Sequence, residues 1–145
     1  MIALIQRVNW ARVTIEKKMS AEIAAGLLGF IGIEKEDTRS SADKLIDKIL
    51  AYRVFADSEG KMNLDLKAIS GDLLLVSQFT LVAATDKGLR PSFSSAKPPH
   101  DAEPLYEYLV VQAKLKHRSV ASGQFAANMQ IALENDGPVT LILKS

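Results

Sequence analysis

The chain contains no cysteine and only two histidines among its 145 residues. The first absence excludes disulfide bonds, thiolate nucleophiles and cysteine-based zinc sites. His100 stands in a proline-rich stretch and His117 in a basic segment, and neither has a partner at the spacing of metal ligands or a catalytic triad. Phosphate-binding glycine motifs are absent as well. We therefore expect no metal and no cofactor, and the usual catalytic side chains are scarce.

Long apolar runs and a strong net charge are also missing. No run approaches the ~20 residues of a membrane-spanning helix. The segment MIALIQRVNWARV alternates apolar and polar residues, unlike the apolar core of a signal peptide. A formal net charge of +1 gives no general attraction to nucleic acid, so an RNA partner must be met by a local patch. We expect a cytoplasmic protein that has no membrane partner.

The length and the apolar patterns of the sequence predict one domain of mixed α and β structure over residues 1–145, because a chain of this length can bury a substantial core. Alternating apolar residues predict two short strands, one from Ala3 to Arg7 and one from Ala11 to Ile15. Residues 22–33, EIAAGLLGFIGI, are apolar on both faces and predict a buried central strand. Residues 56–66 carry turn residues and predict a loop or loose hairpin.

Two helices are predicted from periodicity. Apolar residues between 42 and 50 follow the i, i+3, i+4, i+7 pattern, with Ser40 at the start of that helix. Asp101 is predicted to cap a second helix that turns Leu105, Leu109 and Ala113 inward. Residues 83–100 have no clear period and are predicted to form a long loop.

Two short motifs are candidates for a site. The strand predicted over residues 72–81 becomes polar at SQFT, residues 77–80, and a polar end on a buried strand is a common place for function. NDGPVT, residues 135–140, predicts a hairpin turn followed by a returning strand. Each motif also has a plain structural interpretation, because strand-end hydroxyls often bond to backbone and proline is tolerated at the first residue of a strand.

Taken together, these motifs resemble the D-aminoacyl-tRNA deacylases, formerly called D-tyrosyl-tRNA deacylases. The resemblance covers essentially the whole chain, including GLLGFIGIEKED, YRVFADSEGKMNLDL, LLLVSQFTL and GQFAANMQIALENDGPVT. SQFTL and NDGPVT are the two signature motifs of that family. The resemblance implies an α/β fold with a layered mixed or antiparallel sheet and two main helices, completed by homodimer formation.

The same resemblance implies a hydrolase. Its substrate is the ester bond that joins a D-amino acid, or glycine on the wrong tRNA, to the 3'-terminal adenosine of a tRNA. Hydrolysis releases the amino acid and reusable tRNA, and so proofreads chirality in translation. The implied partners are aminoacyl-tRNA and a second copy of the chain, and no DNA partner is expected.

The resemblance also implies roles for individual residues. The catalytic pocket would be formed by Ser77, Gln78, Phe79 and Thr80. A cis peptide between Gly137 and Pro138 of one subunit would form a wall of the other subunit's pocket, held in orientation by Arg7. Phe125 and Met129 would line the pocket for the terminal base. Arg7 could instead form a surface salt bridge, and Phe125 and Met129 could be plain core residues.

The chemistry leaves alternatives open. A Thr80 nucleophile needs an adjacent base, and none is evident, so we expect attack by water aided by the ribose 2'-hydroxyl, with the amides of Phe79 and Thr80 stabilising the oxyanion. A general esterase or amidase with Thr80 as its nucleophile is one rival. A nucleic-acid-binding module without catalysis is the other. Lys87, Arg90 and residues 114–118 are candidate phosphate contacts.

Overall fold

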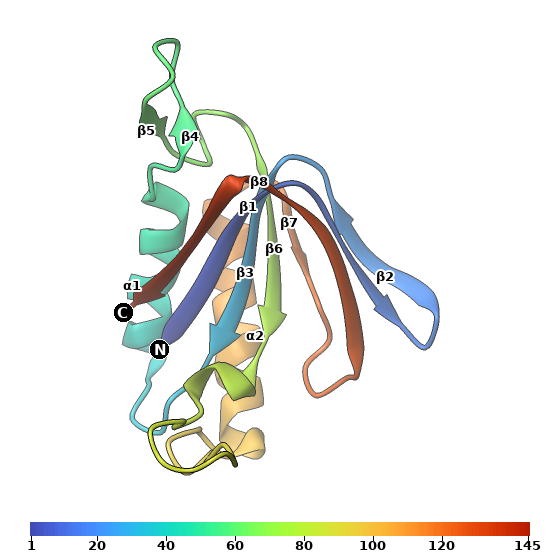
Figure 1. Ribbon diagram of the computed structural model, residues 1–145, viewed down its shortest axis with the longest axis vertical. Coiled ribbons are helices and arrows are strands. Elements are labelled where there is room, and N and C mark those ends of the chain that lie inside the picture. Colours follow the sequence, from blue (N-terminus) through green and yellow to red (C-terminus); the bar gives the residue numbers. More distant parts are fainter.

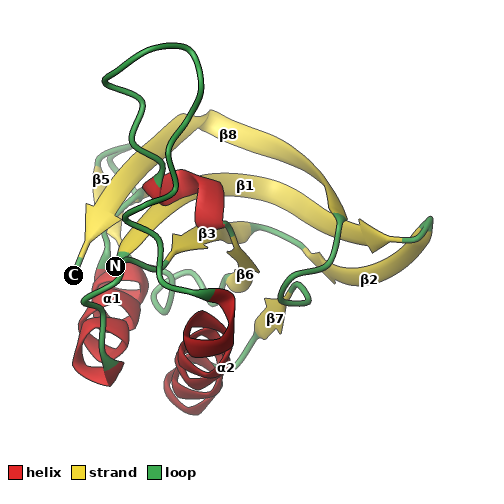
Figure 2. Ribbon diagram, turned by 90° about the horizontal axis from the view of Figure 1, so that it is seen from below, coloured by secondary structure: helices red, strands yellow, loops and turns green.

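The computed structural model describes residues 1–145. Its centre is a six-stranded sheet with the strand order β2-β1-β3-β6-β7, and β8 pairs with the other side of β1. Two long helices lie side by side against one face of this sheet (Figures 1 and 2). The predicted fold class, a layered mixed sheet with two main helices, is confirmed.

The elements follow one another along the chain. They are β1 (Ile2–Ile15), β2 (Lys18–Ile23), β3 (Gly26–Gly32), α1 (Arg39–Ala51), β4 (Phe55–Ala56), β5 (Met62–Leu64), β6 (Asp72–Ser77), the 3-10 helix η1 (Phe79–Val82), α2 (Pro99–Lys116), β7 (Val120–Ser122) and β8 (Met129–Lys144). The longest connection is the loop between η1 and α2, which confirms the long loop expected in this region.

The first element is one long strand, so the prediction of two short strands is wrong. The first half of β1 pairs with β3 and its second half with β2, while β8 pairs along both halves. Buried and less buried residues alternate through Ala3 and Ile5. The alternation is interrupted after Ile5 and resumes at Ala11 and Val13. The strand bends between these stretches, and the sequence shows that bend as an apparent gap.

The apolar segment 22–33 is likewise divided, because Ile23 ends β2 and Gly26 begins β3. β3 is the central strand, antiparallel to β1 and parallel to β6. At Gly26 an added Cβ would lie 1.9 Å from the backbone oxygen of Asp72. Glycine therefore permits the close approach of β3 and β6 at this point.

Both helices form where the periodicity predicts them, but their first residues differ. The N-cap of α1 is Thr38, whose amide donates to Ser41 Oγ at 3.2 Å, and not Ser40. Three hydroxyl residues in this stretch can cap a helix, so the sequence does not choose among them. α2 begins at Pro99, and Asp101 lies in its first turn, where its charge favours the helix dipole without capping.

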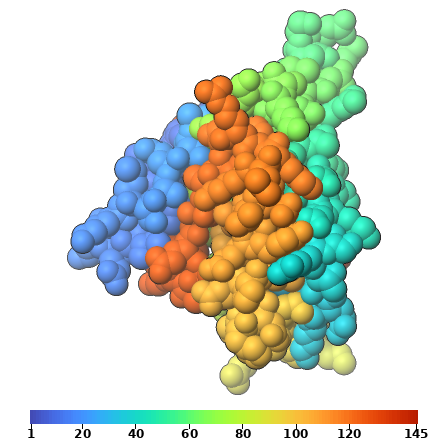
Figure 3. Space-filling view, turned by 180° about the vertical axis from the view of Figure 1, so that it is seen from behind, coloured from blue at the N-terminus to red at the C-terminus, as the bar shows by residue number.

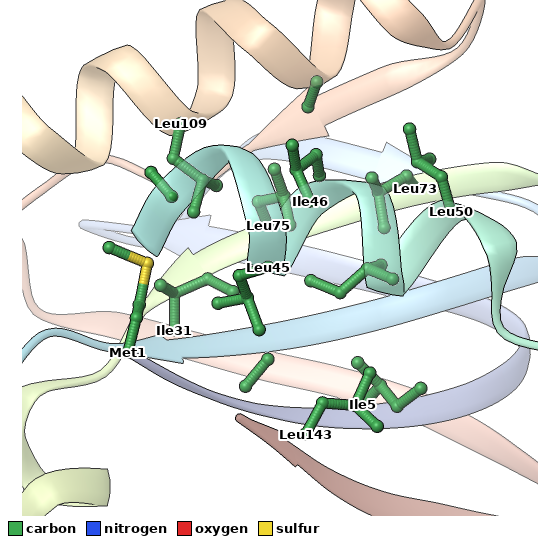
Figure 4. Packing of buried hydrophobic residues seen from close by; sticks show 14 of the residues in the cluster. Met1, Ile5, Ile31, Leu45, Ile46, Leu50, Leu73, Leu75, Leu109 and Leu143 are labelled. Carbon is green, nitrogen blue, oxygen red and sulfur yellow. The ribbon is translucent and has the colours of Figure 1, made fainter. Parts of the chain in front are cut away.

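The main core lies between the helices and the sheet. Figure 4 shows Leu45 and Ile46 of α1 packed among Ile31, Leu73 and Leu75 of the sheet, all almost completely buried. The second helix adds its own predicted inward residues, Leu105, Leu109 and Ala113. Each fully buried side chain of this kind contributes about 1.5–3 kcal/mol, which fixes the helices against the sheet.

The NDGPVT segment is not a hairpin turn, and that prediction is wrong. β8 continues through it as one strand. Gln6 pairs with Thr140 but Val8 pairs with Asn135, so residues 136–139 form a bulge opposite Arg7. The side chain of Asn135 closes the bulge by accepting from the amide of Val139 at 3.0 Å. A bulge uses the same Asp-Gly residues as a turn, which explains the error.

Beyond the bulge, β1 and β8 bend together over the sheet face that the helices leave free (Figure 2). Val13 of β1 and Leu133 of β8 pack there against Leu28 and Leu74 in a second, smaller core. Seen from behind, the helices form the surface and the β1–β2 hairpin projects to one side (Figure 3). The sheet is thus nearly closed into a barrel at one end and open at the other.

The remaining predictions concern smaller features. β4 and β5 pair antiparallel and confirm the loose hairpin expected over residues 56–66. Its Asp57 carboxylate accepts from Asn63 Nδ2 at 2.7 Å, and this bond is the main reason that the pKa of Asp57 is lowered. None of the helices is long and apolar enough to span a membrane.

Candidate active site

The SQFT motif forms a sharp change of direction at the end of β6. The strand ends at Ser77, earlier than predicted, and η1 starts at Phe79. Gln78 is anchored to β3 because its amide donates to the carbonyl of Ile31 at 2.8 Å. The first helical donor is the amide of Leu81, which bonds to Gln78 O at 3.1 Å. The amides of Phe79 and Thr80 therefore have no acceptor within the helix.

Glycine again sets the position of this element. A Cβ on Gly32 would lie 2.8 Å from Val82 Cγ1 and 3.2 Å from Leu81 Cβ. Because Gly32 has no side chain, η1 packs directly on the end of β3. The backbone of the SQFT turn is thereby held against the sheet.

A largely apolar pocket of about 650 Å³ lies beside this turn. Its walls come from the ends of β3 and β6, the start of η1, the loop before α2 and the segment that leads into β8. Five of the residues predicted for the site line it, namely Ser77, Gln78, Phe79, Phe125 and Met129. The fold thus brings together two groups that are far apart in the sequence.

Phe125 and Met129 are both half-buried, with one side toward the core and the other toward the pocket. The ring of Phe125 lies 5.9 Å from that of Tyr106, centre to centre. Met129 passes close to Gly123, where a Cβ would lie 2.7 Å from the methionine Sδ. Their roles as core residues and as pocket residues are therefore compatible.

Thr80 does not line the pocket. Its side chain is exposed, and its Oγ1 accepts from Gln78 Nε2 at 2.5 Å. The only charged residue in the pocket wall is Lys97. No carboxylate or imidazole in the wall is placed to take a proton from Thr80.

Phe93 and Lys97 also line the pocket although neither was predicted for the site, and both come from the segment 83–100. The ring of Phe93 lies 5.1 Å from that of Phe79, so the two aromatic side chains pack together at the pocket. Lys97 donates its amide to the carbonyl of Ile33 at 3.0 Å and so holds the loop on the end of β3. The signals for Phe93 were an aromatic residue in a proline-rich loop and the resemblance of RPSF, residues 90–93, to the family.

Arg7, Gly137 and Pro138 lie elsewhere. Arg7 pairs with Leu27 of β3, whereas Ser77 pairs with Ile31, so the groups are separated by about 13 Å along the sheet. In Figure 1 the bend of β8 and η1 stand at opposite ends of the sheet. One chain therefore does not bring the Gly-Pro segment to the pocket.

The guanidinium of Arg7 holds the bulge in place. Its Nε lies 3.2 Å from the backbone oxygen of Asp136 and 2.9 Å from Asp136 Oδ2, and its Nη1 donates to Val54 O at 2.5 Å. The Arg7 side chain is 14% exposed, so this is a partly buried ion pair and not a loose surface one. The Gly137–Pro138 peptide bond is cis, with Gly137 at a φ of +119°.

Comparison with known proteins places these features in a family. Residues 4–144 match the family model described as D-Tyr-tRNA(Tyr) deacylase. The chain is 56% identical to the D-aminoacyl-tRNA deacylase of Cellvibrio japonicus over 144 residues, covering 99% of each chain. It is also 56% identical to that of Pseudomonas fluorescens, covering 100% of both.

Solved structures agree with this. One titled c-Myc DNA Unwinding Element Binding Protein superposes with a TM-score of 0.96 at 36% identity, covering 100% of this chain and 99% of that one. A second, titled as a probable eukaryotic D-amino acid tRNA deacylase, has a TM-score of 0.87 at 14% identity and covers 99% of this chain and 98% of its own; it shows the shared fold. With the SQFT pocket and the matches along its whole length, the chain belongs to the D-aminoacyl-tRNA deacylase family of hydrolases.

Proposed function

We propose that this protein hydrolyses the ester bond of D-aminoacyl-tRNA in the cytoplasm and thereby removes D-amino acids before translation uses them. The observation that carries the proposal is the pocket in which the SQFT turn faces Phe125 and Met129. One wall offers backbone polar groups and the other offers an apolar and aromatic surface. An aminoacyl group and its terminal adenosine need these two kinds of wall.

The chemistry follows from what the pocket contains. An aminoacyl ester is already activated, so positioning and oxyanion stabilisation can supply most of the rate enhancement. The amides of Phe79 and Thr80 are the donors that we assign to the developing oxyanion, because the helix does not use them. Water attacks the carbonyl carbon, and the neighbouring ribose 2'-hydroxyl assists in proton transfer.

The adenosine end is assigned to Phe125 and Met129. Stacking a base on an aromatic ring contributes roughly 1–3 kcal/mol and does not depend on sequence. An enzyme that accepts many tRNAs needs this kind of contact, since the terminal adenosine is common to all of them. Lys97 is the cation in the pocket wall that could meet a phosphate.

Homodimer formation is part of the proposal. On the sheet face away from the helices, Leu4 has Phe30 and Ile142 as its lateral partners, and Ile142 is 63% exposed. Phe79, at the start of η1, is 62% exposed. A contiguous apolar stripe of this kind suits a self-complementary contact around a twofold axis.

Such a twofold axis also explains the distance between the two signature motifs. Leu4 lies between Ile2, which pairs with Gly32 near η1, and Arg7, which faces the bulge. A twofold axis near Leu4 therefore carries the bulge of one subunit toward the SQFT pocket of the other. Gly137 and Pro138 would wall that pocket on the side where an L-amino acid carries its side chain. Glycine has only hydrogen there, so glycine on the wrong tRNA would also be cleaved.

The proposal predicts selective release of tyrosine from D-tyrosyl-tRNA, with L-tyrosyl-tRNA hydrolysed only at the rate measured without enzyme. The two esters differ in chirality alone, which makes them a matched pair of substrates. Radiolabelled tyrosine released at low enzyme concentration is the measurement. Failure to cleave either ester contradicts catalysis and favours a nucleic-acid-binding module. Cleavage of small esters that lack adenosine would instead indicate a general esterase.

Replacement of Thr80 by alanine is expected to lower kcat by less than about tenfold, because the backbone amide remains. Loss of a true nucleophile typically costs more than ~10⁴-fold. The matched variant is Phe79→Pro, which deletes one proposed oxyanion donor, with Phe79→Ala as the control for loss of the ring. Single-turnover assays on D-tyrosyl-tRNA compare the three. Trapping of an acyl-Thr80 species in the parent enzyme would show that Thr80 is the nucleophile.

A further inference from the structure

Tyr106 contacts both halves of the pocket without lining it. It lies on the inner side of α2, is 3% exposed, and donates its hydroxyl to the backbone oxygen of Leu75 at 2.9 Å. Leu75 is two residues before Ser77 on β6. The only fully enclosed tyrosine hydroxyl of the chain is thus bonded to the strand end that carries the SQFT turn.

The edge of β6 needs a partner at this point. β7 pairs with β6 only from Leu73 to Leu75, and the last contact on that edge is the amide of Gly123 on Leu75 O at 2.8 Å. Beyond Leu75 no strand continues the sheet on this side. The hydroxyl of Tyr106 shares the Leu75 oxygen with the Gly123 amide, and its own oxygen faces the backbone of Ser77. A hydrogen bond from the backbone of Ser77 partly offsets the rise in the pKa of Tyr106 that burial causes.

The ring of Tyr106 makes a separate contact. Its centre lies 5.9 Å from that of Phe125, with an angle of 41° between the planes, a geometry favourable for an aromatic pair. Phe125 stands on the segment that lies across the pocket from Ser77. One side chain therefore joins the strand end that supports the proposed oxyanion site to the residue assigned to the adenosine base.

We propose that Tyr106 is a positioning residue for the deacylation reaction: its hydroxyl fixes the end of β6 and with it the amides that follow Ser77, and its ring fixes Phe125. This inference rests on the function proposed for the pocket. The hydroxyl and the ring act on different steps, because the oxyanion forms in the transition state whereas the adenosine is bound in the ground state as well. The two contributions are therefore separable by mutation.

Tyr106→Phe removes the hydroxyl and keeps the ring. We expect kcat for D-tyrosyl-tRNA to fall by roughly ten- to a hundredfold, with KM unchanged within about twofold, because small displacements of oriented groups have effects of this size. Tyr106→Leu removes the ring as well, and we expect KM to rise in addition. Hydrogen–deuterium exchange of the Ser77 to Thr80 amides gives a second readout, and it should become faster in Tyr106→Phe.

Tyr108→Phe is the matched control. Tyr108 is on the same helix, and its hydroxyl donates to the Asp43 carboxylate at 3.1 Å, away from the pocket. Both phenylalanine variants lose one hydroxyl bond and should lose some thermal stability, but only Tyr106→Phe should lose kcat. Parent-like kcat and amide exchange in a folded Tyr106→Phe would overturn this inference alone. An inactive parent enzyme would overturn the proposed function, and this inference with it.

Discussion

Gly137→Ala is expected to reduce the cleavage of D-tyrosyl-tRNA by roughly a hundredfold or more, because the bulge that carries the proposed pocket wall must rearrange. At a φ of +119° an alanine is strained, which costs about 1–3 kcal/mol. Its Cβ would also lie 2.7 Å from Arg7 Nη2 and 2.9 Å from Val139 Cγ2. Steady-state deacylation and thermal unfolding should therefore both change.

Gly88→Ala is the control for backbone strain alone. Gly88 also has a positive φ, +70°, but an added Cβ there meets no atom within 4 Å. We expect Gly88→Ala to lose a little stability and to retain activity. Equal activity of the two variants would contradict the assignment of the bulge to the site.

A mixing experiment tests whether the wall acts on the other subunit. Gly137→Ala has an intact pocket and Phe79→Pro has an intact wall, so a mixed dimer would contain one complete site. Subunit exchange should then restore roughly a quarter of parent activity, because half of the dimers are mixed and half of their sites are complete. Failure to restore activity, in a sample in which mixed dimers are demonstrated, would contradict a pocket wall contributed by the other subunit.

Gly26→Ala is expected to have the largest effect on stability, more than about 3 kcal/mol in the free energy of unfolding. The Cβ would lie 1.9 Å from the oxygen and 2.6 Å from the nitrogen of Asp72, both of them backbone atoms. Side-chain rotation cannot relieve this contact, so β3 and β6 must separate. Urea denaturation measures the loss, and an insoluble or unfolded product agrees with it.

Gly29→Ala is the matched control in the same strand. Its Cβ would meet only side-chain atoms, the nearest being Leu75 Cδ2 at 3.5 Å, which is ordinary contact. We expect a change of about 1 kcal/mol or less. If both variants lost the same stability, the close approach at Asp72 would not be the cause.

The features that the sequence predicted well depend on local patterns. The helix around Leu45 buries one face and the strand around Leu28 buries both faces. The spacing of apolar residues along the sequence is enough to predict each pattern. The polar end of β6 at Ser77 also stands out locally, because it directly follows the unbroken apolar run from Leu73 to Val76. These features need no knowledge of distant contacts.

The features that were missed depend on distant pairing. The bulge at Gly137 has the residues of a turn, and only the pairing of β8 with the whole of β1 decides between the two. Phe93 and Lys97 join the pocket through a loop without a period, so no pattern marks them. The distance between Pro138 and Ser77 likewise cannot be predicted until the pairing partners of β8 and β6 in the sheet are known.

The pairing of β1 with β8 also has a consequence for folding. Ile2 pairs with Lys144 and Ile15 with Met129, so the longest ladder of the sheet joins segments that the ribosome makes first and last of those described here. Proteins dominated by such distant contacts fold slowly. Until β8 has been synthesised, β1 presents an unpaired edge along its whole length, and exposed strand edges aggregate. We therefore expect the nascent chain to need protection until its final strand has left the ribosome.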